Sequence, residues 1–281
     1  MVYQEHPPHP ALKDHIKCYW TLAVPELGSH NEDQCVLAEG FEFSFILAEP
    51  IGLVTDNSKS FMVNGSCICG PMTRPIRMRP TGRVELLGVC FRPGGAYPFF
   101  PCPADDLVNA SVEVDDLWGS KGSRVVDRVR DGCHTMEERI RILDRHFLHY
   151  LDKGRRSDSR VAAALSIIES HKGRVDIDRL AELAGISIRQ LERRFRERVG
   201  MSPKELCRIL RFKNVFNHLA AYATDSWAST ALACGYYDQS HMIRDFKHYV
   251  GTSPAAYFSR RQAGGGLFTG NLREPPGVRA D

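Results

Sequence analysis

The apolar positions of residues 1–110 follow the two-residue period of β-strands. Short apolar runs alternate with turn residues, and Phe41, Phe43 and Phe45 occupy every second position of one run. Side chains of a strand alternate between the two faces of its sheet, so this spacing predicts strands that bury one face. The predicted strands are residues 16–23, 41–48, 52–55, 61–63, 76–78 and 84–91. Short strands separated by Pro and Gly favour a β-sandwich or β-barrel.

Between residues 121 and 152 the pattern becomes helical. Val125, Val126 and Val129 lie on one face of a first helix. Thr135 and Glu138 have the spacing of a capping box at the start of a second helix. The apolar stripe of that second helix consists of Ile140, Leu143, Phe147 and Leu151. We therefore expect a β-rich domain followed by a pair of helices.

The pattern from residue 160 onward predicts helices alone. A helix over about 161–171 ends at Gly173, and a short helix containing Ala181 then ends at Gly185. Ser187 follows as the N-cap of the next helix. A small residue lets two helices approach closely, glycine adopts a positive φ at a helix end, and serine accepts a hydrogen bond from the first turn. Together these residues predict a helix-turn-helix unit.

In the second helix of this unit, Leu191 and Phe195 are four residues apart and predict the buried face. Arg189 and Arg193 then lie on the opposite face, with Arg196 near them. The sequence therefore places a strongly basic surface on the helix that would read DNA.

The same unit returns about 50 residues later, which makes this half of the chain an internal duplication. Ala181, Gly185 and Phe195 correspond to Ala231, Gly235 and Phe246. Asp238 is the predicted N-cap of the second reading helix, and Met242 faces its core. The outward or flanking positions of this helix are Gln239, Ser240, His241 and Arg244.

A long helix is predicted between the two units. Ser202, Pro203 and Glu205 supply its N-cap, first residue and capping-box acid. Its apolar stripe consists of Leu206, Ile209, Phe212, Phe216 and Leu219. About 18 residues at 1.5 Å each span about 27 Å, which is close to the roughly 34 Å of one duplex turn. The spacing therefore predicts that one chain reads two successive major grooves.

Length and charge support a division into two domains. The chain has 281 residues and a net charge of +3, but residues 1–154 carry 16 basic and 21 acidic side chains while residues 155–262 carry 19 and 11. A basic half joined to an acidic half is expected when only one domain binds a polyanion. The expected domains are a β-rich sensing and dimerisation domain at 1–152, a linker at 153–159, a DNA-binding domain at 160–262 and a flexible tail at 263–281.

The basic half resembles the DNA-binding domain of the AraC/XylS family of bacterial transcription regulators. The stretch ALACGYYDQSHMIRDFKHYVGTSPAAY is similar to that family's signature over its whole length. The resemblance implies seven helices with two helix-turn-helix units that bind double-stranded DNA as one polypeptide. Carried over position by position, it implies DNA contacts from Arg189, Glu192, Arg193, Gln239, Ser240, His241 and Arg244.

The acidic half resembles a less characterised amino-terminal domain found on some of these regulators. The similar segments are GFEFSFIL, CGPMTRPI, GVCFRPGGAYPFF and DDLWGS, and Ala38, Glu39 and Gly40 stand where relatives tend to have Pro-Asp-Gly. The resemblance implies a cupin-like domain followed by helices that form a homodimer. It also implies an unknown small-molecule effector, a role as an activator, and RNA polymerase as a further candidate partner.

The location of the protein is expected to be cytoplasmic. The amino terminus has an early Glu5 and three prolines in place of a basic start and an apolar run, so it does not resemble a secretory signal. The longest apolar stretch, residues 41–48, is far shorter than the roughly 20 residues of a membrane-spanning helix. Nine cysteines without framework spacing favour reduced thiols.

Two alternative functions use side chains of the acidic half. Cys67 and Cys69 would face the same side of a strand, and with Cys90 or Cys102 they form a candidate metal or redox site. An enzyme, either cupin-like or an alkylation-repair protein with a reactive cysteine, is the other alternative. The acid pairs at 105–106 and 115–116 are expected in loops, and residues 36–102 contain no histidine. We therefore expect neither enzymatic activity nor a cofactor.

Overall fold

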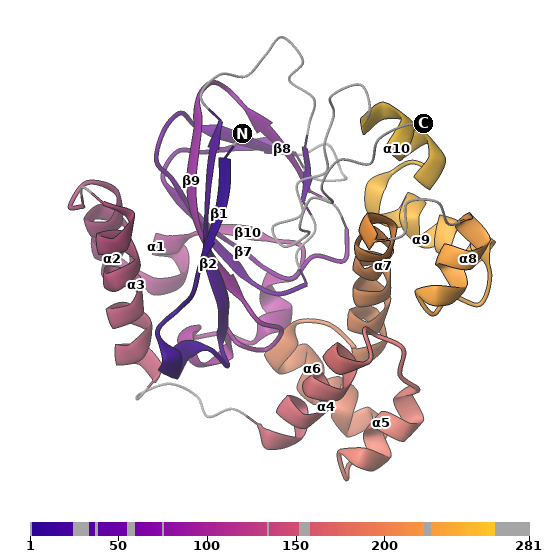
Figure 1. The fold of residues 1–281 in the computed structure, drawn as a ribbon. Helices are drawn as coiled ribbons and strands as arrows, with labels where there is room; N and C mark the ends of the chain where they lie inside the picture. The colour runs from indigo at the N-terminus through magenta and orange to yellow at the C-terminus, as the bar shows by residue number, and fades with distance from the viewer. Residues whose placement is uncertain are drawn as a thin grey trace.

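The computed structural model describes residues 2–24, 34–36, 39–54, 60–74, 76–133, 135–151, 158–221 and 226–261. Two antiparallel sheets occupy the centre of the molecule (Figure 1). Helices α1–α3 cover one side of this β-domain, and helices α4–α10 lie on the other side (Figure 1). Residues 153–157 of the predicted linker and the predicted tail at 263–281 lie outside the described residues. Asp158 and Ser159 are described, as the N-cap and the first residue of the helix that follows the linker.

The larger sheet has six strands in the order β1-β2-β9-β4-β7-β10. These strands are β1 (Val2–His6), β2 (Ile16–Val24), β4 (Glu42–Ile46), β7 (Ser66–Cys69), β9 (Val84–Phe91) and β10 (Ser111–Glu113). β1 and β10 were not predicted from the sequence. Both are edge strands with mostly polar or half-exposed side chains, so their apolar pattern is weak.

The smaller sheet has four strands in the order β3-β8-β5-β6. These strands are β3 (Gln34–Val36), β5 (Ile51–Val54), β6 (Ser60–Val63) and β8 (Ile76–Pro80). Within the described residues the two sheets do not join into a closed barrel, so the arrangement is that of a sandwich. The six predicted strands are confirmed to within a few residues as β2, β4, β5, β6, β8 and β9, whereas β3 and β7 were not among the predicted ranges.

Both faces of the larger sheet are buried. Tyr19, Phe43 and Phe45 belong to one face, where they form an apolar cluster with the helices that follow the β-domain. Trp20 and Leu86 belong to the opposite face, which packs against the smaller sheet. The alternation of Phe43 and Phe45 therefore marks the helix-covered face, as its period predicts.

Three helices cover that face: α1 (Val114–Trp118), α2 (Ser120–Arg130) and α3 (Met136–Leu151). The predicted capping box is present, since the Glu138 amide donates to Thr135 Oγ1 at 3.2 Å and the Thr135 amide donates to Glu138 Oε2 at 3.3 Å. The prediction that both acid pairs lie in loops was wrong. Asp115 and Asp116 lie in the first turn of α1, where acidic side chains interact favourably with the helix dipole. Asp105 and Asp106 lie in the short helix η3 (Ala104–Leu107).

The described part of residues 158–261 contains seven helices, the number that the resemblance implied. They are α4 (Ser159–Ser170), α5 (Ile177–Leu183), α6 (Ile188–Val199), α7 (Pro203–Ala221), α8 (Trp227–Ala233), α9 (Gln239–Val250) and α10 (Pro254–Arg261). Gly185 and Gly235 each have a positive φ, at +66° and +81°, at the turn of the first and second helix-turn-helix unit. The apolar stripe predicted for α7 is buried along its length.

The β-domain packs directly against these helices. The Tyr97 hydroxyl donates to Glu197 Oε1 at 3.0 Å, and the Arg198 guanidinium lies 4.5 Å above the Tyr97 ring. His248 Nε2 lies 3.0 Å from the carbonyl oxygen of Thr73. One apolar cluster is continuous from the space between the two sheets to the core around α6 and α7. The two halves of the chain therefore share a core.

A substitution at Gly88 tests the packing of Trp20 in the β-domain. Gly88 faces Trp20 across β2 and β9, and a Cβ at this position would overlap the buried indole ring. We expect Gly88→Ala to lower the free energy of unfolding by about 1–3 kcal/mol, because the indole ring or the strands must shift to relieve the overlap. Urea unfolding followed by circular dichroism measures the change.

Gly65→Ala is the matched control, because its Cβ would meet only the end of the Arg130 side chain, at 3.3 Å. An equal loss of stability in both variants would contradict the assigned packing of Trp20 over Gly88.

Candidate nucleic-acid interface and internal chamber

The first candidate reading helix, α6, begins at a complete capping box. Gln190 N donates to Ser187 Oγ at 3.3 Å, and Ser187 N donates to Gln190 Oε1 at 3.2 Å. Leu191 and Phe195 are fully buried, which rotates the opposite face of the helix outward. Arg189 and Arg193 are exposed on that face, and Glu192 is half-buried. The predicted site residues of this helix therefore lie together on one surface.

The second candidate reading helix, α9, has the same design. The Asp238 carboxylate accepts a hydrogen bond from the His241 amide at 2.6 Å, as an N-cap does. Met242 and Phe246 are buried, and the exposed predicted residues are Gln239, Ser240 and Arg244. His241 is half-buried, with its ring edge-on to Tyr236 at 5.2 Å. A histidine in this position fills a gap at the start of the helix and exposes only part of its ring.

Other arginines of this domain orient its helices. Arg208 Nε on α7 donates to the buried Asp245 Oδ1 on α9 at 2.7 Å. Arg194 and Arg198 on α6 form ion pairs with Asp158, the N-cap of α4. These three side chains are partly buried in ion pairs within the domain, whereas Arg189, Arg193 and Arg244 are exposed on α6 and α9.

An open groove of about 710 Å³ runs beside α6. Its wall includes Arg189, Arg193 and Arg196 from the helix. Pro103 and Asp105 from the β-domain form the opposite rim. The β-domain thus reaches the edge of the surface that the first helix presents.

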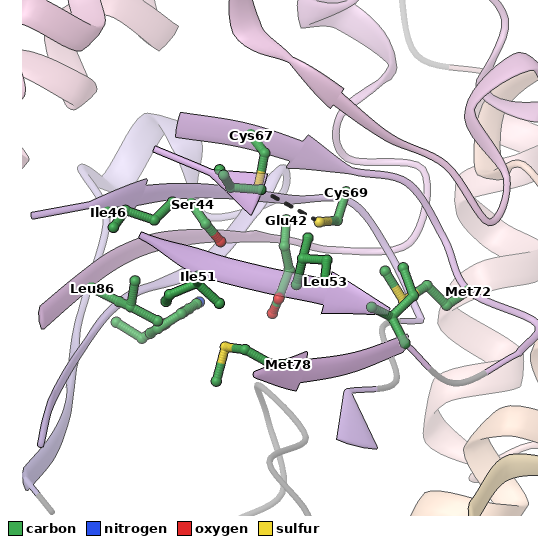
Figure 2. A pocket seen from close by; sticks show the side chains of 13 residues that line it. Glu42, Ser44, Ile46, Ile51, Leu53, Cys67, Cys69, Met72, Met78 and Leu86 are labelled. Atoms are coloured by element: carbon green, nitrogen blue, oxygen red, sulfur yellow. Dashed lines mark hydrogen bonds between the residues drawn. The ribbon is translucent and has the colours of Figure 1, made fainter. Parts of the chain in front are cut away.

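The structure also contains an internal chamber between the two sheets (Figure 2). The space open to the centre of a water molecule is about 50 Å³. The chamber is lined by Trp20, Glu42, Ser44, Ile46, Ile51, Leu53, Val63, Cys67, Cys69, Met72, Ile76, Met78 and Leu86. Among these thirteen residues, Glu42 is the one that carries an ionisable carboxyl group, and Figure 2 shows its side chain among the apolar ones.

Glu42 is placed in the chamber by the register of the larger sheet. It lies opposite Cys90 on β9 and opposite Cys69 on β7. Its side chain is on the face covered by the smaller sheet, so the residue is only 6% exposed. Burial raises the pKa of Glu42 to about 7, with Lys213 opposing this shift and Glu39 adding to it. In the described residues its carboxyl group has no hydrogen-bond or ion-pair partner within reach.

A buried ion pair lies next to Glu42 and joins the two halves of the chain. Lys213 Nζ on α7 is 2.5 Å from Glu39 Oε2, in the segment that precedes β4. Both side chains are almost fully covered. Although burial acts in the opposite direction, Lys213 holds the pKa of Glu39 below its usual value. The pair therefore links α7, the helix between the two helix-turn-helix units, to the segment that precedes β4.

The cysteines of the alternative site are only partly brought together. Cys67 and Cys69 face the same side of β7, as expected, with their sulfur atoms 3.9 Å apart (Figure 2). Cys90 is separated from Cys69 by β4 and lies opposite Cys18, while Cys102 packs against the helix-covered face. The hydrogen bond with Cys67 and burial raise the pKa of the Cys69 thiol well above its ordinary value.

The eight cysteines whose side chains are described are reduced thiols. In the described residues no three His, Cys, Asp or Glu side chains are grouped as metal ligands. The same residues contain no helix long and apolar enough to cross a membrane.

Sequence reasoning missed Glu39, Glu42 and Lys213. A signal for Lys213 was present, because it lies four residues after Ile209 and three before Phe216, on the apolar stripe of α7. A lysine at such a position is buried and needs a partner. The alternation of β4 places Glu42 on the face opposite Phe43, but which faces of the sheet are covered cannot be read from the strand itself.

Two family comparisons cover different parts of the chain. Residues 180–260 match a family described as a helix-turn-helix domain, and residues 4–113 match a family described as a domain of unknown function, DUF6597. Residues 180–260 are therefore a helix-turn-helix domain, the class that the resemblance to the AraC/XylS family implied. The candidate recognition helices α6 and α9 both lie within these matched residues.

The curated relatives are similar over a limited length. The HTH-type transcriptional activator RhaS of Escherichia fergusonii is 26% identical over 114 residues, which are 40% of this chain and 41% of RhaS. An uncharacterized HTH-type transcriptional regulator of Haemophilus influenzae is 32% identical over 101 residues, 36% of this chain and 34% of the relative. The chain therefore spans less than half the length of these relatives.

A crystal structure of ToxT from Vibrio cholerae O395 is similar in fold. It has a TM-score of 0.49 and 13% identity, and the match covers 86% of this chain and 97% of that one.

The buried carboxyl group predicts a specific pH dependence of stability. The pKa of Glu42 is about 7 in the folded protein and has a usual value of 4.5, so the folded state retains a proton that the unfolded chain releases between these values. The contribution of Glu42 to the free energy of unfolding therefore falls as pH rises from about 4.5 to 7. Glu42→Gln removes this effect. From pH 5 to pH 8 we expect the variant to gain about 1–3 kcal/mol relative to the unsubstituted protein.

Urea unfolding at both pH values measures this difference. Ser44→Ala is the control, because it changes a neighbouring chamber residue without removing an ionisable group. A stability difference between Glu42→Gln and the unsubstituted protein that is the same at both pH values would contradict the raised pKa.

Proposed function

We propose that this protein is a transcription regulator that binds double-stranded DNA through α6 and α9 and responds to a small molecule in its β-domain. The observation that carries the proposal is the pair of capped helices, each in its own helix-turn-helix unit, with buried apolar residues on one face and polar or basic residues on the other. The relative RhaS is named a transcriptional activator, which supports a regulatory role.

The chemistry of the outward side chains suits DNA. Arg189, Arg193 and Arg244 are exposed, and an arginine can bind guanine O6 and N7 with two hydrogen bonds or hold phosphates. Gln239 can form the equivalent pair of bonds with adenine. Because Arg208 and Asp245 are paired inside the domain, α9 is held in one orientation before DNA arrives.

The length of α7 supports the reading of two successive major grooves. The helix has 19 residues, which span about 28 Å at 1.5 Å per residue. This is close to the roughly 34 Å between successive major grooves on one side of a duplex. We propose that α7 acts as the spacer between the two reading helices.

Control by an effector is supported by the contacts between the halves. The chamber shares an apolar cluster with the core of the helix-turn-helix domain, and Lys213 joins α7 to Glu39. A molecule that changes the chamber therefore acts on elements that touch the spacer helix. We propose residues 1–152 as the sensing domain, 153–159 as the linker and 160–262 as the DNA-binding domain.

The outward arginines give the main test. A preferred site is first selected from random duplexes, and its affinity is then measured by fluorescence anisotropy over a range of salt concentrations. We expect Arg193→Ala and Arg244→Ala each to weaken binding to the preferred site by about 1–3 kcal/mol if they read bases. An equal loss on random DNA would assign them to phosphates.

Arg83→Ala is the matched control, since Arg83 is an exposed arginine on the β-domain and its loss changes the net charge equally. We expect this variant to bind the preferred site as the unsubstituted protein does. The proposal fails if the unsubstituted protein has no duplex affinity that declines with salt, because counterion release requires that decline.

A further inference from the structure

We propose that the internal chamber binds a compact organic cation, with the carboxylate of Glu42 as its counter-ion. The inference rests on the proposed function, in that it names the class of effector that the β-domain would sense. It depends on one buried carboxyl group, that of Glu42, in an apolar chamber. The nearby ammonium group of Lys213 is already paired with Glu39.

The number of buried charges around the chamber is the first step. In the described part of the chain, two covered carboxyl groups, Glu39 and Glu42, share one covered ammonium group, Lys213. Lys213 contacts Glu39 at 2.5 Å. Lys17 also acts on Glu42, but it is exposed, so water screens it. Glu42 therefore lacks the paired cation that a buried carboxylate requires.

The lining of the chamber gives the second step. Apart from Glu42, its polar groups are Ser44, the two thiols and the indole nitrogen of Trp20, and all other lining side chains are aliphatic or thioether. A sugar or another molecule with many hydroxyl groups would leave several of them without partners, which is costly in a buried site. One cationic group on an apolar body fits this lining. Trp20 adds an aromatic surface of the kind that attracts cations most strongly.

The volume of the chamber and the charge of Glu42 narrow the class of ligand further. The chamber volume of about 50 Å³ exceeds the roughly 10–15 Å³ that one water needs but is smaller than the roughly 150 Å³ of a cavity that binds benzene. The chamber therefore suits a compact molecule, and a single ring enters when adaptable side chains such as Met72 and Met78 shift. An anionic ligand would place its charge beside Glu42, while Lys213 is already bound to Glu39. A neutral ligand would leave Glu42 as it is. When Glu42 is ionised, a cation supplies the opposite charge that this carboxylate lacks among the described residues.

The position of Glu42 connects this site to the helix-turn-helix domain. Glu42 and Glu39 both act electrostatically on Lys213, and Lys213 is part of α7. A cation bound to Glu42 changes the charge balance around that lysine. Ligand binding therefore changes the electrostatic surroundings of α7, the helix between the two helix-turn-helix units, without any contact between the ligand and the DNA-binding residues.

The test uses benzylamine as the cationic probe and benzyl alcohol as its neutral isostere. Isothermal titration of the full chain at pH 8, where the amine is protonated and Glu42 is ionised, measures both affinities. We expect the unsubstituted protein to bind benzylamine about tenfold or more tightly than benzyl alcohol, because a desolvated ion pair forms only with the amine. In Glu42→Gln we expect the two affinities to become equal within about twofold.

Glu85→Gln is the matched control and should retain the preference for benzylamine, because it removes a carboxylate of the β-domain that does not line the chamber. Circular dichroism of each variant checks that the fold is kept. Equal binding of the two probes by the unsubstituted protein, no binding of either, or a preference that survives Glu42→Gln would each overturn the proposal.

The same preparations are assayed for duplex DNA affinity, which separates this proposal from the proposed function. Intact DNA binding without discrimination between the two probes overturns the cation site alone. Discrimination without any salt-dependent DNA affinity supports the cation site and overturns the regulatory function.

Discussion

The burial of both faces of the six-stranded sheet is the constraint on which the rest of this structure depends. Helices α1–α3 cover one face and the smaller sheet covers the other, so four of the five side chains of β4 are buried and Ser44 is half-buried. Phe43 and Phe45 suit such a position, whereas Glu42 does not. A carboxyl group held there either keeps its proton or needs a cation. The covering of both faces of β4 therefore makes the ionisation of Glu42 unfavourable, although the strand has an ordinary alternation of residues.

Helix α7 transmits this constraint to the other half of the molecule. One side of the helix contributes Phe212 and Phe216 to the apolar core, while Lys213 and Arg208 form buried or half-buried ion pairs with Glu39 and Asp245. These two ion pairs lead in different directions, one to the β-domain and one to α9. Helix α7 is therefore in direct contact with both the β-domain and the second candidate recognition helix.

Local signals predicted the helical half well. N-caps at Ser187 and Asp238 and the apolar spacing of Leu191 with Phe195 each depend on residues a few positions apart, which a helix brings together by itself. Among the elements that were missed, the strands β1 and β10 and the short helix α1 were missed for the opposite reason. Their side chains are mostly polar or half-exposed, and they exist because a neighbouring strand or helix supplies their partners.

The sequence by itself determined the duplicated helix-turn-helix units, their outward basic side chains and the strands with a strong two-residue period, because all of these follow from spacing along the chain. The tertiary structure alone decided that the face of β4 carrying Glu42 is covered by the smaller sheet, and that Lys213 on α7 pairs with Glu39, three residues before Glu42. The physical reason is that strand alternation specifies which residues share a face, whereas only packing decides whether that face meets water, helices or a second sheet.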